Sequence, residues 1–209
     1  MGVKFTKEDL EVFSIPDFAG RMAAMRSKVR PKLEALGEEL GPLLMTHFKQ
    51  EFFAHTAKHM RRKVNPPDET WVALGPQSRG YKAYVYFGFC IGLAGSQARV
   101  VMKDESNMRS VLGANLVANR KFLAKNAAEW KGLADYTRRD KNYAPTKIDD
   151  LEAFAVENGK RLQELKSALF DVGLEVKAQS ASLAQDLLKA FDRLHPFYEC
   201  GLKKGVKFR

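Results

Sequence analysis

The sequence predicts an α+β fold: a single domain over residues 1–209, with a mainly antiparallel sheet packed against several helices and a helical N-terminal quarter. Apolar residues recur at helical spacing through the first 43 residues. In the middle of the chain, two runs rich in aromatic and β-branched residues are joined by a short Gly-Ser connection. Helical and strand patterns then alternate irregularly, without an internal repeat or a low-complexity linker, which disfavours a doubly wound parallel sheet.

Two capping patterns begin the helical N-terminal quarter. Thr6 is predicted as the N-cap of a first helix, with Asp9 reaching back to it, and Asp17 as the N-cap of a second. Gly41-Pro42 is expected to end or kink this stretch, because proline lacks the N–H that a helix interior needs. The residues expected to face the core recur three or four positions apart: Phe18, Met22, Met25, Val29, Leu33, Leu36, Leu40 and Leu43.

The period of the pattern changes in the middle of the chain. Residues 70–74 form a short β-prone run. Residues 83–93 are rich in aromatic and β-branched side chains and contain too many glycines for a helix. Residues 97–103 follow after the connection Ala94-Gly95-Ser96. Two strand-like runs with so short a connection predict a β-hairpin.

The C-terminal half mixes helical and strand patterns. The capping pattern at residues 146–149 is predicted to open a helix, and Pro196 is expected to stop the last one. The basic runs 138–141 and 203–209 are expected to be an exposed loop and an exposed terminus, either of which could widen a nucleic-acid footprint. The predicted elements are a helix over 107–126, a strand over 130–137, a helix through 151–165, a strand over 169–178 and a helix over 183–194.

The charge balance restricts the class of partner. The composition is that of an ordinary globular protein, 45% apolar and 29% charged, but the formal net charge is +10. Such an excess favours anionic partners: nucleic acid, phosphorylated metabolites or an acidic surface. Residues 55–82 alone carry six basic and two acidic side chains. A basic surface that is merely solvated explains the charge equally well, so both interpretations stay open.

The cysteines and the apolar stretches indicate the compartment. Cys90 and Cys200 show neither metal-ligand spacing nor the density of a disulfide framework, and Cys90 is predicted to be a core residue. No stretch has the length of a transmembrane helix, and the N-terminus has acids where a signal peptide needs an apolar core. We therefore expect a cytoplasmic protein with no membrane partner. The oligomeric state does not follow from the sequence.

An ordered series of short motifs occupies residues 5–82: FTKEDLEVFSIP, RM, RPKLEALGE, AKHMRRKVNPPDETWVA and RGYK. In these motifs the chain resembles the YktB-like family of small bacterial proteins, a domain of unknown function. Beyond residue 82 only the strand–helix rhythm and the segment 195–198 are similar. The resemblance implies a compact α+β fold in an intracellular bacterial setting, and no activity. The chain departs from the family at residues 85–87. The resemblance leads us to expect a His-Phe pair there, but this chain has Val-Tyr-Phe, so any role of the family's histidine does not transfer to this chain.

The densest chemistry lies in residues 55–82. A basic run ends against Asn65-Pro66-Pro67, and a second basic pair brackets Gly80-Tyr81. If the two pieces meet, they form a basic mouth edged by aromatic rings. Guanidinium groups match phosphate or carboxylate oxygens in pairs, and the rings could stack a base. The predicted ligand-binding residues are Lys58, Arg61, Arg62, Lys63, Asn65, Trp71, Arg79, Tyr81 and Lys82.

A structural interpretation of the same residues competes with this one. In it, Arg61 or Arg62 braces the Pro-Pro turn. The partner of that arginine would be Asp68 or Glu69, and Trp71 would fill the core. Six basic side chains against two acidic ones cannot all be neutralised locally, so for the cluster as a whole an external anion and the structural interpretation both stay open.

Two histidines offer a further kind of chemistry. His55 and His59 lie four residues apart, and Glu51 lies four before His55. On a continuous helix the three would share one face, a spacing that can bind a metal, but the basic flank repels cations and no metal is predicted. His55 and His59 are instead the catalytic candidates of a second hypothesis: an enzyme acting on a phosphorylated or carboxylated small molecule, with one histidine as general acid/base.

No cofactor is predicted. The chain contains no Walker loop, no Rossmann glycine pattern, no nucleophile elbow and no Cys-x-x-Cys pair. The first hypothesis is therefore a binding module for an anionic ligand, either a phosphorylated molecule or nucleic acid. The enzyme remains the alternative.

Overall fold

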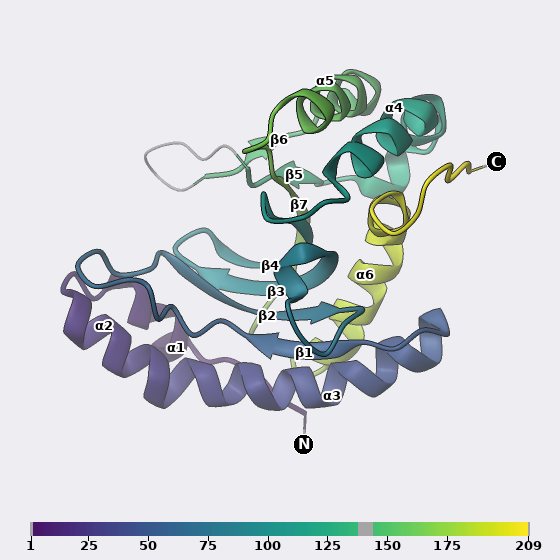
Figure 1. Ribbon diagram of the computed structural model, residues 1–209. Coiled ribbons are helices and arrows are strands. Elements are labelled where there is room, and N and C mark those ends of the chain that lie inside the picture. The colour runs from purple at the N-terminus through teal and green to yellow at the C-terminus, as the bar shows by residue number, and fades with distance from the viewer. Residues whose placement is uncertain (1, 138–143, 209) are drawn as a thin grey trace.

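The computed structural model describes residues 2–137 and 144–208, and within these ranges all strands join one seven-stranded sheet (Figure 1). The strand order is β1-β2-β3-β4-β7-β5-β6, and every neighbouring pair is antiparallel. The predicted α+β class with an antiparallel sheet is confirmed. In chain order the strands are β1 (Phe53–Thr56), β2 (Glu69–Gly75), β3 (Val85–Gly92), β4 (Gly95–Met102), β5 (Ala134–Asp135), β6 (Thr146–Lys147) and β7 (Phe170–Glu175).

The predicted hairpin forms as β3–β4, and it lies at the centre of the sheet. Its register runs from the pair Val85–Met102 to the pair Gly92–Gly95. The turn therefore consists of two residues, Leu93 and Ala94. Gly95 has a φ of 82°, a left-handed conformation that glycine adopts without steric cost. The tight turn fixes the register, and thereby which side chains of both strands face each side of the sheet.

The N-terminal quarter is helical, and both predicted caps form. The Thr6 N–H donates to Asp9 Oδ2 at 2.7 Å, and the Gly20 N–H donates to Asp17 Oδ1 at 2.6 Å. A near-continuous helical run then lies along β1 and β2 (Figure 1). The elements are α1 (Lys7–Glu11), the 3₁₀-turn η1 (Val12–Ser14), α2 (Phe18–Ala24), the π-helical segment η2 (Met25–Val29) and α3 (Arg30–Phe48).

Pro42 does not end its helix, and the predicted stop at Pro196 is wrong. Helix α3 continues through Pro42 to Phe48, and helix α6 (Leu183–Cys200) continues through Pro196. An interior proline costs about 3 kcal/mol. In α6 the continued helix fully buries Phe197 and Tyr198. Each buried side chain of this size contributes about 1.5–3 kcal/mol. Burial therefore outweighs the lost hydrogen bond.

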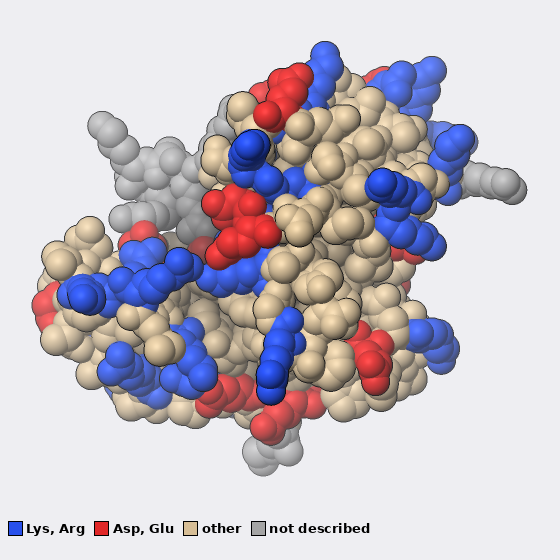
Figure 2. Space-filling model, viewed as in Figure 1, with Lys and Arg blue, Asp and Glu red and all other residues tan. Residues whose placement is uncertain are grey.

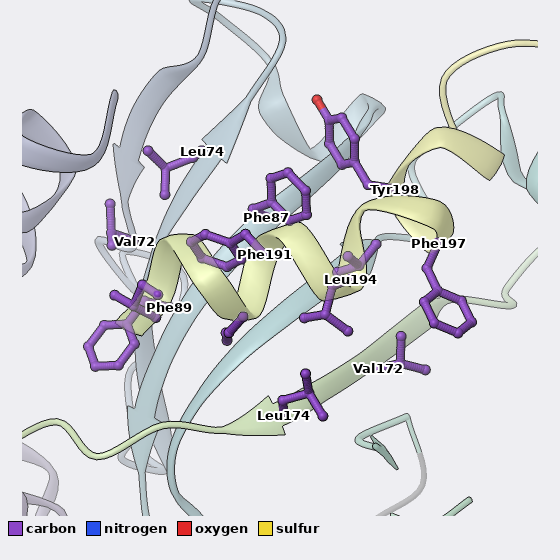
Figure 3. Close-up of a cluster of buried hydrophobic side chains, with 14 of the residues drawn as sticks. Val72, Leu74, Phe87, Phe89, Val172, Leu174, Phe191, Leu194, Phe197 and Tyr198 are labelled. Carbon is purple, nitrogen blue, oxygen red and sulfur yellow. The ribbon is translucent and has the colours of Figure 1, made fainter. Parts of the chain in front are cut away.

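The main core lies between one face of the sheet and the helices α3 and α6. Alternate residues of each central strand point to this face, as the period of two requires. Figure 3 shows their side chains meeting those of α6. The buried residues labelled there are Val72, Leu74, Phe87, Phe89, Val172, Leu174, Phe191, Leu194, Phe197 and Tyr198.

Helices α4 (Arg109–Lys125) and α5 (Leu151–Glu164) pack together beyond the other end of the sheet. A Cβ atom on Gly113 would lie 2.4 Å from the carbonyl oxygen of Gly159, so the two backbones touch only because both residues are glycines. The cap of α5 differs from the prediction. Asp150 accepts from the Ala153 N–H at 2.9 Å, while the predicted cap, Thr146, lies in β6.

The strand predicted over residues 130–137 is reduced to β5. Trp130 belongs to the 3₁₀-turn η4 (Ala127–Trp130), and its indole N–H donates to the Arg193 carbonyl oxygen at 2.6 Å. The basic run 138–141 lies outside the described residues. The domain boundaries 1–209 stay a prediction.

The C-terminal segment is attached to α4 by hydrogen bonds. The prediction of an exposed terminus did not include this attachment. Asn115 Nδ2 donates to the Lys203 carbonyl oxygen at 2.7 Å, and Asn119 Nδ2 donates to that of Val206 at 2.8 Å. Val206 is buried, whereas the lysine side chains of the segment are exposed. The backbone is therefore ordered and the charge faces outward.

Both cysteines are buried and free, as expected for Cys90. Burial raises the pKa of the Cys90 thiol to about 12 and that of Cys200 to about 12. Both side chains are thus neutral thiols at physiological pH.

Candidate functional site

The face of the sheet opposite to the main core carries polar and aromatic side chains. Over it lies a cleft of about 940 Å³, which we name the basic cleft. The structure brings eight of the predicted site residues to its lining: His55, Lys58, His59, Arg61, Arg62, Trp71, Tyr81 and Lys82. The two basic stretches of the sequence therefore do approach one another, some twenty residues apart in the chain.

Five segments build the basic cleft, and one of them is β2, which carries Glu69 and Trp71. His55 lies on β1, and the loop from β1 to β2 carries the basic run that follows it. Tyr81 and Lys82 lie in the 3₁₀-turn η3 (Tyr81–Ala83), and Lys103 directly follows β4. Figure 2 shows Lys and Arg side chains gathered over the β1–β2 loop, with an acidic patch beside them.

Three predicted residues do not line the basic cleft: Lys63, Asn65 and Arg79. All three are exposed. Asn65 contributes through its backbone, because its carbonyl oxygen accepts from Arg62 Nη1 at 3.4 Å. A role for these three side chains in binding stays a prediction.

One side of the basic cleft is a row of four rings, which we name the aromatic wall: His55, Tyr81, Trp71 and His59. His55 stacks on Tyr81 with ring centroids 4.9 Å apart and an angle of 17°. The Trp71 indole N–H donates to Tyr81 Oη at 3.3 Å. His59 meets Trp71 edge-on at 5.3 Å. Trp71 is half-buried: it lines the cleft and packs against a small buried cluster that includes Tyr86, so it lies outside the main core.

The continuous helix on which Glu51 and the two histidines would share one face does not form. His55 lies on a strand, and His59 lies in the following loop with a φ of 49°. Within residues 2–137 and 144–208, no group of three or more histidine, cysteine or carboxylate side chains is placed to hold a metal ion. A spacing of four residues brings side chains to one face of a helix, but it does not do so on this strand and loop.

The protein holds both imidazole rings in place. His55 Nε2 donates to the Gln77 carbonyl oxygen at 2.9 Å, and His59 Nε2 shares a hydrogen bond of 3.1 Å with Thr70 Oγ1. The pKa of His59 is lowered from 6.5 to about 4. Burial is the main cause, and the positive charges of Arg62 and Lys82 add to it more than the negative charge of Glu69 offsets. His59 is therefore neutral at pH 7.

The carboxylates of the turn pair with arginines outside the cluster. Asp68 lies 3.8 Å from Nη1 of Arg21, a buried side chain of α2 that also donates to the Pro67 carbonyl oxygen at 3.1 Å. Glu69 pairs with Arg99 Nη2 at 2.8 Å. The Pro-Pro turn is thus braced from α2 by Arg21. Arg62 braces it as well, because its Nη1 donates to the Pro66 carbonyl oxygen at 3.4 Å.

The cations of the cleft are only weakly neutralised. Five cationic side chains and two carboxylates line it, and both carboxylates are committed elsewhere. Glu105, just outside the lining, lies 3.8 Å from Arg61 and 3.8 Å from Lys82. The Arg61 side chain is 86% exposed, so this contact is worth well under 1 kcal/mol. The five lining cations are Lys58, Arg61, Arg62, Lys82 and Lys103.

Sequence reasoning missed Lys103. Its Nζ lies 5.5 Å from the centre of the Trp71 ring, within the range of a cation–π contact. The residue is distant from the basic cluster in sequence and reaches the cleft only because β4 pairs with β3 and β3 with β2. Strand pairing alone would not have shown this contact, because Trp71 pairs with Cys90 and Cys90 with Gln97, a β4 residue six positions before Lys103.

A buried polar network lies beneath the cleft, and it was also missed. Arg99 on β4 is 1% exposed. Its Nη2 donates to Glu69 Oε2 at 2.8 Å and to Gln97 Oε1 at 2.6 Å, and its Nη1 lies 3.4 Å from Asp171 Oδ2. A Cβ atom on Gly173 would lie 2.6 Å from Arg99 Cγ, so glycine leaves the room for this side chain. The network fixes Glu69 at the floor of the cleft.

Fold and site together define an α+β protein with a basic, aromatic-walled cleft. The profile of the family described as "Domain of unknown function (DUF1054)" matches residues 5–198. A UPF0637 protein of Lysinibacillus sphaericus is 30% identical over 214 residues, which cover 98% of this chain and 99% of the relative. One of Staphylococcus carnosus is 33% identical over 206 residues, 93% of this chain and 97% of the relative. The chain belongs to the DUF1054 family, and the predicted YktB-like membership is confirmed.

The family fixes the bacterial setting and assigns no activity. A UPF0637 protein of Bacillus mycoides is 48% identical over 94 residues, 45% of this chain and 44% of the relative. Along residues 2–137 and 144–208, none of the helices is both long and apolar enough to span a bilayer. The cytoplasmic location stays a prediction.

Proposed function

We propose that this protein is a binding module for a phosphorylated ligand, which it holds in the basic cleft. The observation that carries the proposal is the charge of the lining. Five cations face the cleft, while its two carboxylates are paired with Arg21 and Arg99. Guanidinium and ammonium groups that outnumber their carboxylate partners around one hollow are suited to phosphate oxygens, which accept charge-assisted hydrogen bonds.

The test measures binding of inorganic polyphosphate by calorimetry at low salt. The double variant Lys58→Ser/Arg61→Ser removes two exposed lining cations, and we expect it to weaken binding about tenfold or more. The matched control is Lys203→Ser/Lys204→Ser, which removes the same charge from the exposed C-terminal segment. We expect the control to bind almost as the wild type does. Absent binding, or equal losses in both variants, would contradict the proposal.

One observation favours the enzymatic alternative: both histidines line the basic cleft, and His59 is neutral at pH 7. A neutral imidazole can accept a proton from a substrate. The alternative ranks second because Nε2 of each ring is already engaged, with Gln77 and with Thr70. Only the Nδ1 atoms are left for proton transfer, and one carboxylate of the cleft, Glu69, is committed to Arg99.

A further inference from the structure

The aromatic wall is a feature that phosphate binding alone does not need. We propose that the basic cleft takes a base ring joined to phosphates, the repeating unit of single-stranded nucleic acid. In this arrangement the base lies against the Trp71–Tyr81 part of the wall and the phosphates lie on the cations. The inference rests on the proposed function and narrows its ligand.

The wall is preorganised for a planar ring. Each of its members is fixed by a contact within the protein: His55 by Gln77 and Tyr81, Tyr81 by Trp71, and His59 by Thr70. Behind Tyr81 stands Tyr86, edge-on at 5.2 Å and 1% exposed. Side chains that are already ordered lose little conformational entropy when a ligand stacks on them.

The wall is also electrically suited to a base. Burial raises the pKa of Tyr81, so its phenol stays neutral, and the lowered pKa leaves His59 neutral as well. These rings therefore offer π-surface and not charge. The charge comes from the side chains around them, including Lys103 at 5.5 Å from the Trp71 ring. Aromatic stacking beside a cationic track is the arrangement by which proteins hold single strands.

The spread of the cations favours a strand over a mononucleotide, and access to the base favours a single strand over a duplex. The cations come from three separate segments: the loop after β1, the turn η3 and the end of β4. They therefore line more of the cleft than one phosphate group can occupy. A duplex keeps its base faces inside the stack, so only an unpaired base can reach Trp71.

The experiment titrates the native protein at low salt with a twelve-residue oligodeoxythymidylate and with an abasic deoxyribose-phosphate strand of the same length. The two probes carry the same phosphates and differ only in the bases. We expect the thymidylate to bind about 5- to 150-fold more tightly, the range for one stacked base. Trp71 fluorescence should be quenched on binding, whereas Trp130, 4% exposed, should be unaffected.

Variants of Trp71 separate stacking from folding. Trp71→Leu should bring the affinities for the two strands to within about twofold, and Trp71→Phe should preserve most of the preference and lose the quenching. Because the comparison of the two strands uses the native chain, it decides the matter even if a variant folds poorly.

Each outcome has a defined meaning. Equal affinity for thymidylate and abasic strands, or binding of a DNA duplex as tight as that of the single strand, would overturn the inference while leaving the proposed function in place. If no strand and no polyphosphate binds, the proposed function itself fails. Equally tight binding of ADP with quenching would support the base-and-phosphate chemistry and assign it to a free nucleotide.

Discussion

The conformation of His59 is unusual among the single residues of this chain. Its φ of 49° lies in the left-handed region, which costs a non-glycine residue free energy. Burial beside Trp71 and the nearby positive charges also disfavour its charged form, so that its pKa is lowered to about 4. The lowered pKa follows from placing an imidazole in the wall of a basic cleft.

The pH dependence of stability tests this placement. An unfolded chain takes up a proton on His59 near pH 6.5, but the folded chain only near pH 4. The free energy of unfolding should therefore fall between pH 6.5 and pH 4. Urea denaturation at pH 7 and pH 4 should show that the wild type loses about 1–2 kcal/mol more than His59→Asn, a value discounted for partial exposure. Asparagine tolerates the left-handed conformation, so the variant tests the charge.

The same residue shows where prediction from the sequence ended. Most of the cleft could be predicted because its residues are close in the chain, within 55–82. The spacing of His55 and His59 did not decide their structure, because a spacing of four occurs both on a helix and on a strand that leads into a loop. Lys103 and Arg99 were missed because only strand pairing brings them to Glu69 and the cleft.

Helix α4 holds the C-terminal segment through two asparagines one turn apart. Asn115 and Asn119 are each 3% exposed, and their side-chain amides form hydrogen bonds with backbone groups of the segment, as a neighbouring strand would. Asn119 Nδ2 donates to the Val206 carbonyl oxygen at 2.8 Å, and its Oδ1 accepts from the Phe208 N–H at 2.9 Å. Asn115 Oδ1 accepts from the Val206 N–H at 3.2 Å. Side chains thus satisfy backbone groups that a terminal segment would otherwise leave to water.

Replacing these amides tests the attachment. Asn119→Ala removes hydrogen bonds on both sides of the side chain, and we expect a loss of about 2–3 kcal/mol in the free energy of unfolding. Hydrogen exchange should also show loss of protection at the Phe208 amide. Asn126→Ala at the end of the same helix removes one local bond to the Phe122 carbonyl oxygen and should cost less than half as much. Unchanged protection at Phe208 in Asn119→Ala would contradict the assignment.

The elements differ in how well the sequence predicted them, and the reason is physical. The caps at Thr6 and Asp17 and the β3–β4 hairpin are local features, so a few neighbouring residues determine them. The ends of α3 and α6 depend on burial against distant strands, which local rules about proline do not include. The cap of α5 was misplaced because the pattern at 146–149 forms an edge strand with β5.

At the scale of the whole molecule, the distribution of charge matters more than its sum. The formal net charge of +10 is shared between the basic cleft, the exposed C-terminal lysines and other surface sites. A protein whose whole basic surface binds polyanions diffusely would respond to the loss of any lysine. A protein with one site would respond only to lysines of that site.

The salt dependence of single-strand binding separates these two cases. Each phosphate neutralised on a single strand contributes about 0.7 to the fall of log affinity with log salt, so the five lining cations set an upper limit of about 3.5. Lys82→Met, which removes one lining cation, should reduce the slope by about 0.7. Lys203→Met removes the same charge from the exposed C-terminal segment and should leave the slope unchanged. Fluorescence anisotropy of a labelled oligonucleotide, recorded from about 50 to about 300 mM salt, measures the slope of each variant. Equal reductions in the two variants would mean a diffuse basic surface, because only a localised site distinguishes lysines by their position.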